Sequence, residues 1–132
     1  MASTKRPVIK LEISLFDKII EGIGFLLLIA MWLCVLVQYS GMPDLIPIHF
    51  NFSGKADSFG HRSDIYSLPM LATALYMLLT FVNNYPQYFN YLTPITPENA
   101  HRQYVMATRL LRYLKVLVVV IFATLISMTI HY

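Results

Sequence analysis

The sequence predicts an all-α integral membrane protein with three transmembrane helices. Its 132 residues are 57% hydrophobic and only 13% charged, whereas about a quarter of the residues of an ordinary soluble protein are charged. Three runs without Asp, Glu, Lys or Arg are long enough to cross a hydrocarbon core, which takes about 20 residues: 22–39, 65–82 and 116–132. We interpret residues 1–132 as a single membrane domain.

The residues before the first run predict an amphipathic approach helix. Between Pro7 and Glu21, charged side chains separate apolar residues that recur at helical spacing, namely Leu11, Leu15 and Ile19. Such a helix lies along the membrane surface before the first transmembrane helix, residues 22–39. Partial alternation from Val8 to Leu15 leaves a short strand as an alternative.

Residues 42–62, between the first two runs, form a loop that we expect to hold a fixed shape outside the membrane. Pro47 keeps the backbone extended, because proline fixes its own φ and disfavours a helical residue before it. Gly54 and Gly60 are expected where φ is positive or where two parts of the chain come close. These three residues are the predicted structural turn residues of the loop.

The loop also alternates in character. Ile48, Phe50 and Phe52 alternate with His49 and Asn51, so an extended backbone places the apolar and the polar side chains on opposite sides. The predicted residues for binding a ligand or partner are the polar ones of this loop: His49, Asn51, Asp57 and Arg62.

The loop resembles that of a known family. Its pattern is Pro47-x-His49-Phe50-Asn51, followed by Gly54, Asp57, Gly60 and Arg62, and a second stretch is Phe89-Asn90-Tyr91. This is similar to the front domain of the SdpI-like bacterial membrane proteins, which carries a Pro-x-His-Phe-Asn signature. The resemblance implies a bacterial membrane protein that faces a toxin or peptide, with an immunity-like role.

One cluster has side chains of the kind that bind metals: His49, Asp57 and His61. Imidazole and carboxylate together suit zinc or another divalent ion, although the spacing matches no established zinc signature. The alternatives are that Asp57 caps a local turn, His49 donates a hydrogen bond inside the loop and His61 is solvated, or that the cluster serves proton-linked chemistry. No hydrolase elbow, zinc-protease helix or phosphate-binding glycine loop occurs in the sequence. We therefore expect no catalysis and no cofactor, with a metal-dependent membrane enzyme as the alternative.

The third helix is predicted over residues 97–131. Thr96, Pro97 and Glu98 form a typical helix start, with a capping hydroxyl, a proline in the first turn and a carboxylate near the positive end of the helix dipole. Apolar residues of its first half fall on one face, and its arginines fall nearly opposite. That basic face (Arg102, Arg109 and Arg112) is expected to meet anionic lipid headgroups rather than nucleic acid.

Lys and Arg collect on the cytoplasmic side of membrane proteins. They are concentrated before the first run and between the second and third runs. We therefore expect a multi-pass protein of the bacterial cytoplasmic membrane, with its N-terminus inside and its loop 42–62 and C-terminus outside. The expected function is that of a binding, immunity-like or accessory subunit. Its expected partners are the bilayer, a peptide or toxin, and other membrane subunits in a homo- or hetero-oligomer.

Overall fold

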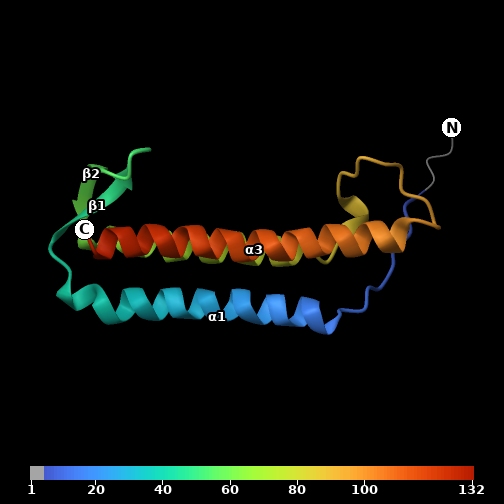
Figure 1. Cartoon of the computed structure of the whole chain (residues 1–132), viewed down its shortest axis with the longest axis horizontal. Helices are drawn as coiled ribbons and strands as arrows, with labels where there is room; N and C mark the ends of the chain where they lie inside the picture. The colour runs from blue at the N-terminus through green and yellow to red at the C-terminus, as the bar shows by residue number, and fades with distance from the viewer. Residues whose placement is uncertain (1–4) are drawn as a thin grey trace.

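The computed structural model describes residues 5–132, which form an elongated bundle of helices (Figure 1). The α-helices are α1 (Leu15–Gln38), α2 (Ser67–Val82) and α3 (Ala100–Ile130). Helix α3 packs against both other helices, which contact each other much less. Together with the 3-10 turns at their ends, all three helices are long and apolar enough to span a membrane.

A small β-hairpin lies at one end of the bundle, next to the C-terminus (Figure 1). Its strands β1 (Leu45–Phe50) and β2 (Ala56–His61) pair antiparallel. The all-α prediction was therefore incomplete, because loop 42–62 contains a two-stranded sheet. The connecting segment, residues 83–99, lies at the opposite end, together with the start of the described chain (Figure 1).

The predicted approach helix is not present as a separate element. Residues 5–14 form neither helix nor strand, and α1 begins at Leu15. The cause is Ser14, whose Oγ accepts a hydrogen bond from the backbone N of Asp17 at 3.1 Å. This N-cap starts the helix at once, so Asp17 and Glu21 belong to the same helix as the first apolar run.

The other helix boundaries are close to the predicted ones. Helix α2 begins at Ser67, within the predicted range 65–82, and follows a 3-10 turn, Arg62–Tyr66. Helix α3 begins at Ala100, later than the predicted residue 97. Thr96 and Asn99 exchange two hydrogen bonds between backbone N and side-chain oxygen, and this turn holds the chain outside the helix until Asn99.

The buried interior changes character along the bundle. Near the hairpin it is apolar, with Leu28, Met31, Val35, Ile46, Ile65, Ala72, Val119 and Ile126. Towards the other end the buried residues of α3 are Ala100, Tyr104, Thr108, Arg112 and Lys115, most of them polar or charged. The expectation that the arginines of α3 lie opposite its buried face is therefore wrong for Arg112.

Candidate functional site

The tip of the hairpin is a turn organised by Asn51. The side-chain Oδ1 of Asn51 accepts hydrogen bonds from the backbone N of Ser53 and of Lys55, each at 3.0 Å, and from the hydroxyl of Ser53 at 2.9 Å. Gly54 follows with φ of +76°, a conformation that residues with a Cβ rarely adopt. The tip is therefore a defined turn rather than an irregular loop.

The root of the hairpin is closely packed at Gly60. A Cβ at this position would collide with the carboxylate of Asp64 and lie 3.0 Å from Cγ2 of Ile48. Pro47 is buried, and its carbonyl oxygen faces the hydroxyl of Thr129 on α3 at 3.4 Å. These contacts fix the hairpin to the end of the bundle.

His49 and Asp57 face each other across the hairpin. Nδ1 of His49 lies 2.6 Å from Oδ1 of Asp57, with side chains 68% and 44% exposed. This pair uses Nδ1, so Nε2 of the imidazole is the atom that can meet a partner. Irregular register on both sides of His49 breaks the alternation that the sequence predicted, and Phe52 is fully exposed.

The remaining predicted residues of the loop lie apart from this pair. His61 is opposite Leu45 at the root, and its Nδ1 lies 2.9 Å from the hydroxyl of Ser63. Arg62 lies near the carboxylate of Asp44 at 3.7 Å and covers the ring of Tyr39. The structure thus brings His49 and Asp57 together without His61. Within residues 5–132, no group of three His, Cys, Asp or Glu side chains is placed to hold a metal ion.

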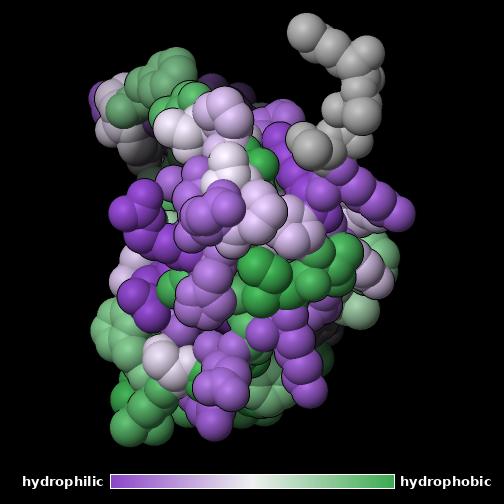
Figure 2. Space-filling model, turned by 90° about the vertical axis from the view of Figure 1, so that its right-hand side faces the viewer, coloured by the Kyte–Doolittle hydropathy of each residue, from purple (hydrophilic) through white to green (hydrophobic). Residues whose placement is uncertain are grey.

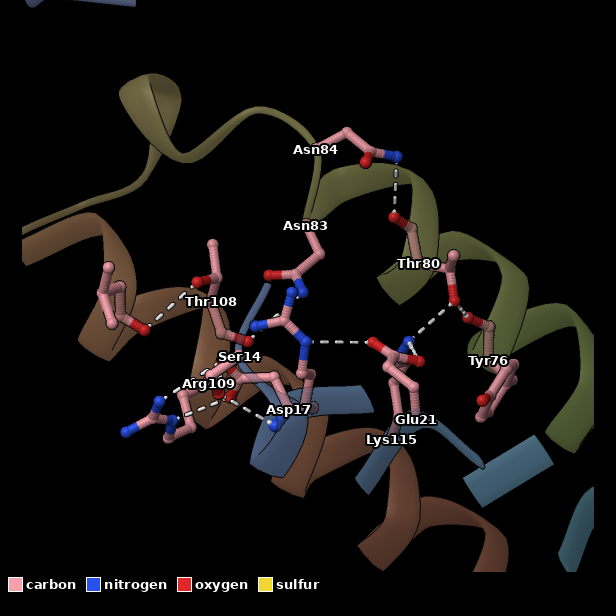
Figure 3. A network of polar contacts seen from close by, with 12 residues as sticks. Ser14, Asp17, Glu21, Tyr76, Thr80, Asn83, Asn84, Thr108, Arg109 and Lys115 are labelled. Atoms are coloured by element: carbon pink, nitrogen blue, oxygen red, sulfur yellow. Dashed lines mark hydrogen bonds and ion pairs between the residues drawn. The ribbon is translucent and has the colours of Figure 1, made fainter. Parts of the chain in front are cut away.

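A second polar site lies between the helices at the other end of the bundle (Figure 3). We call it the charged cluster; it consists of Asp17 and Glu21 from α1 and of Arg109, Arg112 and Lys115 from α3. Asp17 is buried and forms a two-point pair with Arg109, with Oδ1 to Nε at 2.8 Å and Oδ2 to Nη2 at 3.3 Å.

Glu21 is the centre of the rest of the cluster. Its Oε2 accepts a hydrogen bond from Nζ of Lys115 at 2.6 Å, and its Oε1 lies 3.2 Å from Nε of Arg112. Nζ of Lys115 also donates to the hydroxyl of Thr80 on α2 at 3.1 Å. The side chain of Lys115 is only 2% exposed, and a buried ammonium needs such partners. Lys115 therefore ties all three helices together.

Near Arg112 and Asn83, two buried polar atoms at the charged cluster do not form hydrogen bonds within residues 5–132. Nε of Arg112 forms the ion pair with Glu21 without the geometry of a hydrogen bond, and the buried Oδ1 of Asn83 has no hydrogen-bond partner among the described residues. The amide nitrogen of Asn83 donates to the carbonyl oxygen of Thr108 at 3.2 Å (Figure 3). In the cluster two carboxylates face three cationic side chains, and this arrangement suits the holding of helices in register.

The charged cluster was not predicted from the sequence, which led us to expect Arg109 and Arg112 at lipid headgroups. The structure turns both towards carboxylates, while Arg102 is exposed. Lipid contact by these arginines stays a prediction. The signal that could have found the cluster is the matched spacing of acids four apart, at positions 17 and 21, and of bases three apart, at 109, 112 and 115, since such residues share a helix face.

The connecting segment is held by the start of the chain. Nη1 of Arg6 donates to the carbonyl oxygens of Phe89 at 2.6 Å and of Gln87 at 3.1 Å. Tyr91 packs against Tyr104, and burial together with that neighbour raises the pKa of Tyr91 to about 12. The middle of the surface at this end of the molecule is mostly hydrophilic around a central hydrophobic patch, and further hydrophobic side chains lie along its edges (Figure 2).

Comparison with known proteins centres on the hairpin. Residues 26–73 match the family described as a domain of unknown function, DUF1648, a stretch that runs from α1 through the hairpin into α2. An uncharacterized protein of Archaeoglobus fulgidus is 35% identical over 68 residues, which cover 46% of this chain and 37% of that protein. The chain thus spans little more than a third of this relative. No solved structure matches this chain.

Proposed function

We propose that this is a multi-pass membrane protein without catalysis of its own, which acts through its hairpin as a binding, immunity-like or accessory subunit. The observation that supports this best is the His49–Asp57 pair on an exposed hairpin whose turn and root are both fixed. A preformed binding element loses little conformational entropy when it meets a partner. The resemblance to SdpI-like proteins favours a toxin or peptide as that partner, and a larger membrane complex is the alternative.

We also propose that the hairpin end faces outwards from a bacterial cytoplasmic membrane. Lys10, Lys18 and Arg102 are exposed at the opposite end, and such an excess of basic side chains is typical of the cytoplasmic side. At the hairpin end, by comparison, Arg62 and His49 lie beside the carboxylates of Asp44 and Asp57.

Partner binding is tested by co-purification in mild detergent after cross-linking in the membrane. His49→Ala should reach the normal membrane abundance and lose the partner that wild type retains, because the pair with Asp57 holds the imidazole in place. Ser58→Ala, at the position opposite His49, is the matched control and should retain the partner. A His49→Ala protein that retains the partner at normal abundance contradicts the proposal. Zinc bound by wild type but not by His49→Ala would instead favour a metal-dependent enzyme.

Orientation is tested by thiol labelling of intact cells in a Cys34→Ser background, since Cys34 is the one cysteine of the chain. A cysteine in place of Lys55 should react with a membrane-impermeant reagent, and one in place of Arg102 should react only after the cells are opened. Both positions are exposed, so accessibility within the fold does not bias the comparison. The reverse pattern would move the hairpin to the cytoplasm.

A further inference from the structure

The charged cluster indicates how far the hydrocarbon layer extends. A hydrocarbon core takes up about 20 helical residues. Counted from the residue after Glu21, that length reaches about Gly41; counted back along α2 from Val82, it reaches about Ser63. Along α3, the 17 residues from Val116 to Tyr132 are at the short end of the range of roughly 17–25 residues that cross a hydrocarbon core. The counts along α1 and α2 therefore place the boundary of the layer at the root of the hairpin.

The exposed side chains of the helices support the same boundary. Val37, near the end of α1, is 75% exposed, and Met70, in the first turn of α2, is 61% exposed. These large apolar groups lie next to the hairpin root, and lipid tails are the medium that can cover them. Hydrocarbon therefore extends to the level at which the chain enters and leaves the hairpin.

The hairpin does not extend the bundle into water. Figure 1 shows that the hairpin projects to the side of the bundle. Along the long axis, its tip lies closer to the middle of the bundle than its root does. The turn at Asn51 and the packing at Gly60 hold this direction. The tip is thus at the depth of the membrane surface, beside the helices.

The side chains at the tip match that depth. Phe52 is fully exposed, and Lys55, three residues further along the same turn, is exposed too. An aromatic ring and a long cationic side chain in one exposed turn suit the boundary between acyl chains and headgroups, where the ring meets hydrocarbon and the ammonium meets phosphate. The other charges of the hairpin are engaged, because His49 faces Asp57 and Arg62 faces Asp44.

We infer that the hairpin is a shallow membrane anchor, in which Phe52 enters the acyl–headgroup boundary and Lys55 meets a lipid phosphate. Its partner is the lipid surface of the leaflet on the hairpin side. The anchor keeps the His49–Asp57 pair at the membrane surface. A binding partner of that pair therefore has to be met there rather than in bulk water. This inference goes beyond the proposed function and stands without it.

Tryptophan fluorescence in vesicles of phosphatidylcholine and phosphatidylglycerol tests the anchor. Trp32 is the one tryptophan of the chain, so Phe52→Trp is made in a Trp32→Phe background. Val37→Trp in the same background gives the lipid-facing reference, and Lys10→Trp gives the aqueous one. The tryptophan replacing Phe52 should emit at shorter wavelength than the one replacing Lys10. Lipids brominated near the headgroup should quench it more strongly than lipids brominated deep in the chain.

The anchor is overturned if the tryptophan replacing Phe52 emits like the one replacing Lys10, is quenched by iodide and does not respond to brominated lipid. Because Trp32 donates a hydrogen bond to Thr73 at 2.9 Å, its replacement can weaken the fold. A second measurement therefore keeps Trp32: a nitroxide attached to Phe52→Cys in a Cys34→Ser background. That label should collide more with oxygen than with a water-soluble nickel complex, and the opposite ratio overturns the anchor as well.

The contribution of Lys55 has its own test. Lys55→Glu places a negative charge at the same depth, so it should shift the emission of the tryptophan replacing Phe52 towards longer wavelength in vesicles that contain phosphatidylglycerol. In vesicles of phosphatidylcholine alone the shift should be smaller. If the tryptophan replacing Phe52 emits at the same wavelength with Lys55 and with Lys55→Glu in both kinds of vesicle, the contact between Lys55 and a lipid phosphate is contradicted.

Discussion

The two ends of the bundle are built on opposite principles. At the end with the charged cluster, Lys115 and Asp17 are buried, while apolar side chains such as Leu110 and Leu117 are exposed. At the hairpin end, Ile46 and Ile65 are buried, while His49 and Asp57 are exposed. The first arrangement suits helices whose outer faces meet lipid, and the second suits a segment that presents polar side chains at the membrane surface.

The difference teaches what holds each end together. Between helices in lipid, apolar side chains have no hydrophobic driving force, because lipid tails are as apolar as leucine. Register must then come from polar pairs and from close packing at small residues, such as the Glu21–Lys115 pair and Gly24. The hairpin carries exposed polar side chains that water reaches, so burial of Ile46 of β1 against the bundle stabilises the hairpin directly.

The largest effect is expected from the charged cluster. Lys115→Ala leaves Glu21 without its closest partner and removes the hydrogen bond to Thr80. Loss of one member of a buried pair costs about 3–5 kcal/mol. We expect the lower end of that range, since Glu21 is 33% exposed and keeps Arg112. The measurement is the midpoint of unfolding in detergent, with the exposed Lys18→Ala as control.

A double variant shows whether charge pairing is the cause. Glu21→Gln combined with Lys115→Met removes both charges at similar volume, and replacement of a whole buried pair is often nearly neutral. Because Arg112 then loses its carboxylate partner, the double variant should recover only part of the stability that Lys115→Ala loses. If it is no more stable than Lys115→Ala, packing rather than charge pairing holds this end.

A smaller effect is expected at Gly24, where α1 passes close to the other two helices. A Cβ there would lie 3.3 Å from Oη of Tyr76 and 3.3 Å from Cγ2 of Val116. Gly24→Leu should lower the free energy of unfolding by about 1–3 kcal/mol, the usual cost of overpacking. Gly22→Leu is the matched control, because among residues 5–132 no atom beyond its chain neighbours and the nearby backbone of α1 lies within 4 Å of a Cβ there. Equal stability of both variants would show that α1 can move away freely.

The smallest effect is expected at the hairpin tip. Gly54→Ala forces a residue with a Cβ into φ of +76°, which costs roughly 1 kcal/mol. The cost is local, so amide hydrogen exchange should speed up within the hairpin and remain unchanged in α1 and α3. Gly41→Ala, where φ is not positive, is the control. Faster exchange throughout the bundle would mean that the two ends are not independent.

Much of the helical fold could be predicted from composition, because stretches without charge are decisive for membrane spans. The hairpin was harder to predict. Each strand has six residues, Pro47 interrupts the first, and irregular register at His49 breaks the alternation that marks a strand. The start of α1 was placed too late, because the N-cap at Ser14 draws a charged stretch into a helix that was expected to begin after it.

The charged cluster could not be read from hydropathy alone. That reading assumes that charged side chains face outwards, and it therefore assigned Arg109 and Arg112 to lipid headgroups. Whether a base meets a carboxylate or a headgroup depends on how two distant segments align. Asp17 and Arg109 are 92 residues apart in the chain. The pairing follows from the packing of α1 on α3, which no local pattern contains.

Helix α3 connects the hairpin end of the bundle to the opposite end as one continuous helix. It is 31 residues long, a rod of about 46 Å at 1.5 Å per residue. Near its start, the hydroxyl of Tyr104 donates to the carbonyl oxygen of Pro7 at 2.9 Å, and near its end Thr129 contacts Pro47 of the hairpin. No proline interrupts it. A force that tilts the hairpin would therefore move the opposite end of α3 as the far end of a lever.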